Sequence, residues 1–152
     1  MSAPRPRTLA RPVTFGLFDG LTCFLGVLLG LLAHSSLILG VAIGVGAAET
    51  VGMAAGEWLS ESRNGLLPSL AIGLATGAGA VIPALPFAVM PGWYARGWCI
   101  ALILAITALI TWKRYRTGER SLALAAAESY GVLLAAAAVV AVCVHFTPGG
   151  AA

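Results

Sequence analysis

Residues 37–59 read LILGVAIGVGAAETVGMAAGEWL, an apolar stretch that contains the acidic residues Glu49 and Glu57. A helix that crosses a bilayer needs about 20 mainly apolar residues, so this stretch is long enough to span a membrane. The rest of the chain has the same character, because 59% of its 152 residues are hydrophobic and only 10% are charged. Soluble domains carry roughly 25% charged residues. The composition excludes an ordinary soluble protein and favours an integral membrane protein.

Similar apolar stretches flank this one on both sides. They are Phe15–Leu32, Leu66–Val89, Trp98–Trp112 and Leu122–Phe146. The sequence therefore predicts an all-α integral membrane protein with five transmembrane helices, which form one domain at 14–147 between short tails at 1–13 and 148–152. Within the third stretch, Pro83 and Pro86 predict a break in the helix.

The basic residues predict how the protein is oriented. With five spans, every Lys and Arg except Arg96 falls on one side of the membrane, and short basic loops are typical of the cytoplasmic side. We therefore expect a cytoplasmic N-terminus, with the basic tail at 1–13, and an external C-terminus. The basic residues on the expected cytoplasmic side are Arg5, Arg7, Arg11, Arg63, Lys113, Arg114, Arg116 and Arg120.

Acidic residues lie where a charge is costly. Asp19 falls inside the first expected span and Glu49 near the middle of the second, and an ionisable group at the bilayer centre costs about 2.5 to 3.5 kcal/mol. Met53 and Glu57 follow Glu49 at successive helical turns, so these side chains lie along one stripe. Glu61 extends the series to the cytoplasmic end of the helix. We expect these five residues to line an ion pathway, with proton coupling at Glu49 and Asp19.

Two alternatives to this interpretation stay open. Asp19 and Glu49 could join helices structurally, as protonated or hydrogen-bonded polar groups do in membranes. Glu61 could belong to an ordinary solvated helix end. If the stripe does bind an ion, carboxylates suit hard or borderline divalent ions, and the Met53 thioether favours iron or manganese over magnesium.

Small residues line the first two expected helices. On the second helix a series with a small residue at every turn begins at Gly40 and ends at Gly52 and Gly56. Such series allow helix backbones to approach closely. We expect these glycine faces to pack on each other or within a dimer. The glycines assigned to this packing are Gly16, Gly20, Gly26, Gly30, Gly52 and Gly56.

The remaining polar and sulfur-containing residues suggest no other chemistry. Cys23, Cys99 and Cys143 lie in three different stretches without CxxC spacing, so we expect small buried apolar residues and neither disulfides nor a zinc site. Glu128 lies near the arginine-rich loop, where snorkelling or an ion pair with Arg120 would satisfy it. Paired nucleophile and base residues, phosphate-binding loops and HExxH motifs are missing from the sequence, so we do not expect an enzyme.

Three segments carry a family resemblance. FGLFDGLTCFLGVLLG at 15–30 contains Gly-x-x-Asp-Gly-Leu, GMAAGEWLSES at 52–62 contains Met-x-x-Gly-Glu-aromatic-x-Ser, and GAVIPALPF at 79–87 contains Ile-Pro-x-Leu-Pro. In this order they resemble the first three helices of the vacuolar iron transporter family, which includes bacterial members. The last two spans are similar to that family in number and composition only.

The resemblance implies five helices per chain and a homodimer with the ion path between the two first helices. It also implies proton-coupled export of Fe(II), sometimes Mn(II), from the cytosol. Asp19 matches the family's first-helix acid, Met53 its second-helix methionine, and Glu57 the acid that follows glycine. The implied partners are membrane lipid, the transported ion, protons and a second copy, with no nucleic acid and no permanently bound cofactor. The expected location is a bacterial plasma membrane.

The chain also departs from the family pattern. Some members carry a second-helix acid where this chain has Val45, and its own acid, Glu49, lies one turn closer to Met53. Many members insert a Glu-rich cytoplasmic metal-binding domain where this chain has only a short loop around Arg63–Gly65. The resulting prediction is a divalent metal exporter without that domain. The alternatives are a structural or assembly membrane protein whose acids only lock helices together, and a channel or transporter for another solute.

Overall fold

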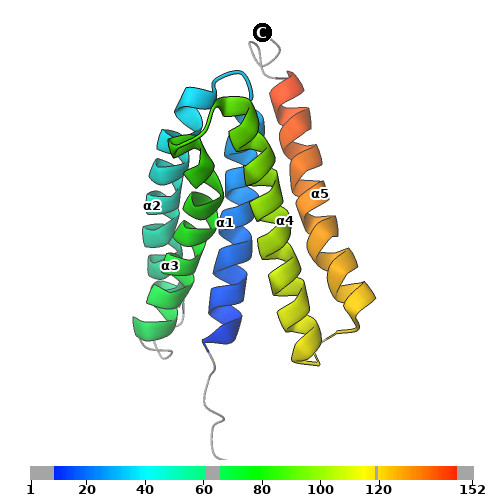
Figure 1. Cartoon of the computed structure of the whole chain (residues 1–152). Helices are drawn as coiled ribbons and strands as arrows, with labels where there is room; N and C mark the ends of the chain where they lie inside the picture. Colours follow the sequence, from blue (N-terminus) through cyan, green and yellow to red (C-terminus); the bar gives the residue numbers. More distant parts are fainter. Residues whose placement is uncertain (1–8, 61–65, 119, 147–152) are drawn as a thin grey trace, which may run out of the picture.

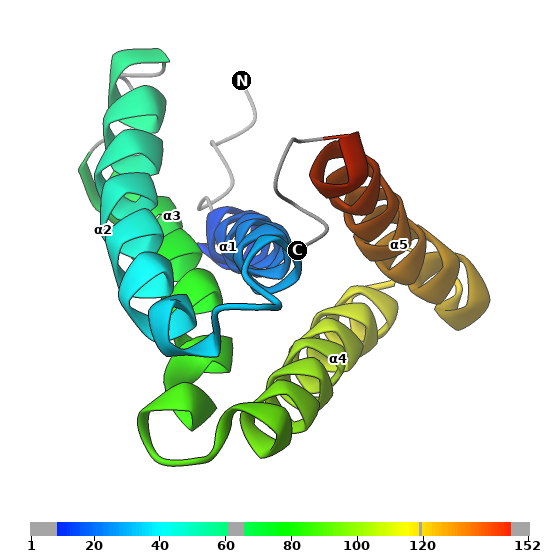
Figure 2. The same ribbon diagram turned by 90° about the horizontal axis from the view of Figure 1, so that it is seen from above.

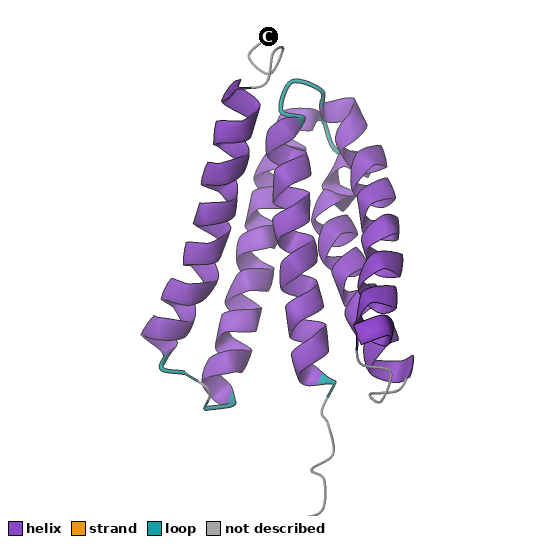
Figure 3. Cartoon of the chain, turned by 180° about the vertical axis from the view of Figure 1, so that it is seen from behind, coloured by secondary structure: helices purple, strands orange, loops and turns teal. Residues whose placement is uncertain are grey.

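The computed structural model describes residues 9–60, 66–118 and 120–146, and within these ranges every regular element is helical (Figure 1). The elements are α1 (Ala10–Gly30), α2 (Ser35–Ser60), α3 (Leu66–Val81), the 3₁₀ helix η2 (Ile82–Ala88), α4 (Gly92–Arg116) and α5 (Leu122–Phe146). The described connections, between α1 and α2 and between η2 and α4, are short, as Figure 3 shows from behind. Five helical segments, with α3 and η2 counted as one, are long and apolar enough to cross a membrane. The prediction of five such helices is confirmed.

Two helices begin more than one turn before the apolar stretches that predicted them. α1 begins at Ala10, so Arg11 belongs to the helix and not to the tail expected at 1–13. Pro12 is compatible with this early start, because N–H groups in the first helical turn have no acceptor within the helix. The N–H that proline lacks is therefore not needed there. α4 covers Gly92–Arg116 instead of Trp98–Trp112, since its aromatic and basic ends suit the membrane surface and remain helical.

The third span changes its backbone at the expected prolines. α3 ends at Val81, and Pro83 and Pro86 lie within η2. Proline lacks an N–H and its ring clashes with the carbonyl one turn earlier, which disfavours the α-helix. Both prolines are buried, and η2 packs against α2 and α4. The break in the helix is therefore covered by protein rather than by lipid.

The helix α3 joins the first two helices. It packs along both α1 and α2, whereas α1 and α2 contact each other much less. A Cβ added to Gly20 would lie 2.8 Å from the Ala80 nitrogen, and one added to Gly73 would lie 2.8 Å from the Ala54 Cβ. These glycines let the backbones touch. On the other side of α1, α4 and α5 complete an arc that leaves one side of α1 uncovered (Figure 2).

The two ends of the bundle differ in charge. The starts of α1, α3 and α5 lie at the same end as the last residues of α2 and α4 (Figure 1). We call this the basic end, because it carries most of the basic residues that the structure describes. At the opposite end, Arg96 donates a hydrogen bond to the Leu32 carbonyl. The described basic residues of the basic end are Arg11, Lys113, Arg114, Arg116 and Arg120.

Large apolar side chains cover the outside of the bundle as well as its core. Phe24 and Ile38 are fully buried in the core, but Leu134 is 71% exposed and Val139 is 62% exposed. A water-soluble protein rarely presents such a continuous apolar surface. The outer faces of the helices are therefore suited to lipid.

Candidate functional site

Asp19 and Glu49 lie at similar depths on α1 and α2. At about 1.5 Å per residue, Asp19 is roughly 14 Å along α1 from Ala10, and Glu49 is roughly 17 Å along α2 from Ser60. Ala10 and Ser60 both lie at the basic end (Figure 1). Both acidic side chains are partly buried within this single chain. The fold therefore brings the two intramembrane acids to the same level of neighbouring helices.

Cys23 lies between these two acids. Its thiol is close enough to the Glu49 carboxylate for the two side chains to interact. Asp19 lies one turn before Cys23 on α1 and is close enough for its charge to act on both residues. The Glu49 Oε2 atom is buried and has no hydrogen-bond partner in the described part of the chain. A buried carboxylate oxygen without a partner is costly, so Glu49 favours a proton or a cation there.

Met53 and Glu57 continue from Glu49 toward the basic end. All three side chains are partly buried, and they follow the buried Ala42 and Gly46 along the same stripe of α2. This stripe faces partly toward the interior of the chain. Glu61, the last member of the expected series, lies outside the described residues.

The described acids, histidines and cysteines do not form a complete metal site in one chain. Among residues 9–60, 66–118 and 120–146, no three such side chains lie close enough together to hold a metal ion. Asp19, Cys23 and Glu49 are neighbours, but they do not converge on one point. Any ion bound at this level needs further ligands, such as the Met53 thioether, water or a second copy.

The glycine faces pack differently from the expectation. Gly16 and Gly20 contact α3 rather than α2, and Gly26 lies 3.7 Å, measured from an added Cβ, from Val140 of α5. Gly30, Gly52 and Gly56 have open space around them within the chain. Within one chain the first two helices therefore do not meet through their glycines, and packing of these faces within a dimer stays a prediction. α3 supplies its own glycines and lies between them.

The sequence did not single out the α2 glycine that makes this packing possible. A Cβ added to Gly46 would lie 2.9 Å from a Val81 methyl carbon and 3.2 Å from the Gly77 carbonyl oxygen. Thr50 folds its hydroxyl back to the Gly46 carbonyl at 2.8 Å and fills the space over Gly77. The exposed face with Gly40 and Gly52 is a separate surface on the outside of α2.

The cysteines were also expected to be buried apolar residues, and this holds for only one of them. Cys99 is fully buried in the core. Cys143 is exposed on α5, and Cys23 is partly buried with a polar role. The spacing of Cys23, one turn after Asp19, was the signal that could have identified it as part of the site.

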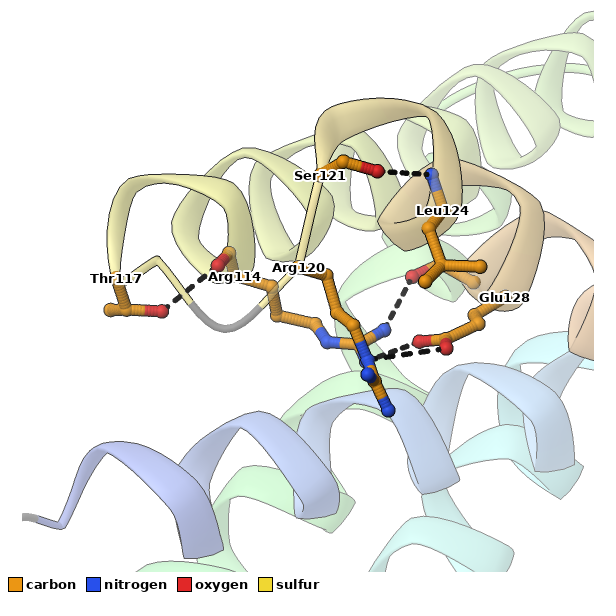
Figure 4. Close-up of polar contacts among 7 residues, drawn as sticks. Arg114, Thr117, Arg120, Ser121, Leu124 and Glu128 are labelled. Atoms are coloured by element: carbon orange, nitrogen blue, oxygen red, sulfur yellow. Dashed lines mark hydrogen bonds and ion pairs between the residues drawn. The ribbon is translucent and has the colours of Figure 1, made fainter.

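The junction of α4 and α5 holds Glu128 between two arginines (Figure 4). The Glu128 carboxylate lies 2.5 Å from Arg114 Nη2 and 3.5 Å from Arg120 Nε. The expected pairing with Arg120 is confirmed, and the shorter contact to Arg114 adds to it. Arg114 also reaches the Ser129 hydroxyl at 3.4 Å. Glu128 is therefore fully engaged at the basic end.

Comparison with known proteins does not extend the resemblance seen in the motifs. No family model, no curated protein and no solved structure matches this chain.

Proposed function

We propose that this protein is a divalent metal exporter that moves Fe(II) or Mn(II) out of the cytosol in exchange for protons. In this proposal the basic end faces the cytosol, as the positive-inside rule favours, and the membrane is a bacterial plasma membrane. Glu57, with Glu61, receives the ion at the end of α2. Met53 and Asp19 pass it inward, and Glu49 exchanges protons near the middle of the membrane.

The observation that carries this proposal is the placement of Asp19 and Glu49. Two carboxylates lie at matching depth on neighbouring helices, and one of them has a buried oxygen without a hydrogen-bond partner among the described residues. Acids inside a membrane mark ion or proton pathways by default. Approach of a divalent cation favours the charged carboxylate and releases its proton. This competition couples the movement of the metal ion to the movement of protons.

A homodimer completes the proposed pathway. One copy does not gather three acid, histidine or cysteine ligands among its described residues, and one side of α1 is uncovered (Figure 2). A second copy against that side would double the number of acids along the path. The resemblance of three segments to the vacuolar iron transporter family supports the same arrangement.

A structural role for the two acids is the main competing function. The proximity of Cys23 and Glu49 favours it, because polar side chains that meet between membrane helices hold those helices together. In that case the protein transports nothing, and Glu49 serves only assembly. An amide at position 19 or 49 would then preserve the function.

The proposal is tested with purified protein in proteoliposomes that carry a pH gradient. Uptake of Fe(II), Mn(II), Co(II) and Zn(II) is measured separately, together with the movement of protons. We expect uptake of Fe(II) or Mn(II) to be faster than uptake of the other ions. This uptake should stop when the pH gradient is dissipated. Protein-free vesicles give the background rate. If none of the four ions moves above that background, the proposal is wrong.

A further inference from the structure

A cavity lies at the basic end, and neither Asp19 nor Glu49 lines it. It has a volume of about 590 Å³ and lies between α1, α4 and α5. Its lining includes the basic residues Arg11, Lys113 and Arg114, with Glu128 as the acid among them. This excess of positive charge repels metal cations, so the cavity does not extend the proposed ion path.

The polarity of the cavity changes along the bundle axis. Arg11 and Lys113 lie near its outer end, whereas Phe18 and Ile110 line its inner part. From Ala10 to Phe18 the lining extends roughly 12 Å along α1 toward the centre of the membrane. A cavity with a basic mouth and apolar walls matches a charged head group with an acyl chain attached.

The basic groups at the mouth have donors available. Lys113 Nζ donates to the Ala10 carbonyl at 3.3 Å and to the Thr14 hydroxyl at 3.0 Å, which leaves one of its three donors for an anion. Arg11 is exposed and makes no ion pair with any residue in the described ranges. Arg114 is already engaged by Glu128, as Figure 4 shows. Lys113 and Arg11 are therefore the groups that would bind a phosphate.

We infer that this cavity is a binding site for one anionic phospholipid of the membrane leaflet at the basic end. The phosphodiester binds between Arg11 and Lys113, and one acyl chain lies along Phe18, Ile110 and Val132. Basic pockets between transmembrane helices are suited to anionic head groups. The apolar inner wall favours a lipid over free phosphate, because inorganic phosphate gains nothing from contact with Phe18 or Ile110.

Such a lipid would connect parts of the fold that make few direct contacts. Lys113 already joins α4 to the first turn of α1, and α1 and α4 otherwise share few contacts. A phosphate between Arg11 and Lys113 would strengthen that link. We therefore expect the bound lipid to raise the thermal stability of the protein.

The inference is tested by native mass spectrometry of delipidated protein, titrated with phosphatidylglycerol or with phosphatidylcholine of the same acyl chains. We expect phosphatidylglycerol to bind more tightly and to raise the melting temperature. Arg11→Gln should weaken its binding about fivefold, since one basic residue at the membrane surface contributes about 1 kcal/mol. Equal binding of the two lipids would overturn the inference.

The matched control is Arg116→Gln, which removes the same charge from the basic end outside the lining of the cavity. It should change binding less than twofold; a loss equal to that of Arg11→Gln would show diffuse attraction to the surface and no site. Val132→Trp tests the apolar wall, because Val132 is 52% exposed and the larger ring fits without disturbing the core. We expect it to weaken phosphatidylglycerol binding. If inorganic phosphate displaces the lipid completely and Val132→Trp has no effect, the cavity is a site for a free anion and the inference is wrong.

Discussion

The Cys23 thiol on α1 lies close enough to the Glu49 carboxylate on α2 for the two groups to interact, and these two helices are otherwise held together mainly through α3. The Glu49 Oε2 atom is buried and has no hydrogen-bond partner among the described residues. The Glu49 side chain therefore lies between the two helices and offers an oxygen to a proton or a cation.

The stability contributed by the contact between Cys23 and Glu49 is measured with two substitutions of Cys23. We expect Cys23→Ala to lower the free energy of unfolding by about 0.6 kcal/mol, the average for a polar interaction between membrane helices. Cys23→Ser keeps a donor of similar size and serves as the matched control. Unfolding in mixed micelles gives both values. Equal stability of the Ala and Ser variants would mean that the contact contributes nothing.

The packing of α1 on α3 predicts opposite outcomes for the same substitution at two glycines. Gly20→Ala should destabilise the protein by about 1 to 3 kcal/mol, because the new methyl group meets backbone atoms of α3 that cannot move aside. Gly52→Ala meets open space within the chain and should be neutral or slightly stabilising. The melting temperatures of the two variants in detergent test this difference. If Gly20→Ala has the same melting temperature as the parent protein, α1 does not lie this close to α3.

The exposed glycine face of α2 predicts the position of a subunit contact. Gly52→Leu should leave the fold of one chain intact, since no described residue beyond its own helical turn lies within 4 Å of an added Cβ. It should weaken the dimer, because a bulky side chain prevents two backbones from approaching closely. Light scattering in detergent measures the oligomeric state. A dimer of unchanged affinity would show that this face of α2 contacts lipid.

The distribution of basic residues predicts the orientation in the membrane. In a cysteine-free background, a cysteine at position 121, next to Arg120 at the basic end, should be reached by a charged maleimide only from the cytosolic side. A cysteine in place of Trp93, 68% exposed at the other end, should be reached only from outside. Labelling of both positions from the same side would contradict the expected topology.

Much of the fold could be predicted from the sequence because the apolar stretches are long. The bounds of α5 agree with the expected span, and the break after Val81 falls at the two prolines. The extra turns of α1 and α4 were missed because hydropathy detects the bilayer core and not the helix. Arg11 and Lys113 are too polar for the core, yet both continue helices.

The candidate site could be predicted only in part. Helical periodicity placed Glu49 and Met53 on one stripe, since that relation is local. The partner of α2 depends on contacts between distant segments, and periodicity gives no information about them. For this reason the pairing of Gly46 with Gly77 and the proximity of Cys23 to Glu49 appeared only in the structure.

The most direct test of metal–proton exchange is pH-gradient-driven Fe(II) and Mn(II) flux through Asp19→Asn and Glu49→Gln in proteoliposomes, with melting temperatures from the same preparations. Each amide keeps the size of the acid but loses its charge, so the fold should persist. The matched control is Glu128→Gln, because Glu128 is an acid that is bound between two arginines at the basic end. We expect both pathway variants to melt near the parent and to transport no faster than protein-free vesicles, while Glu128→Gln transports normally. Parental flux through Asp19→Asn and Glu49→Gln would show that these acids only join helices, and would contradict the proposed exchange.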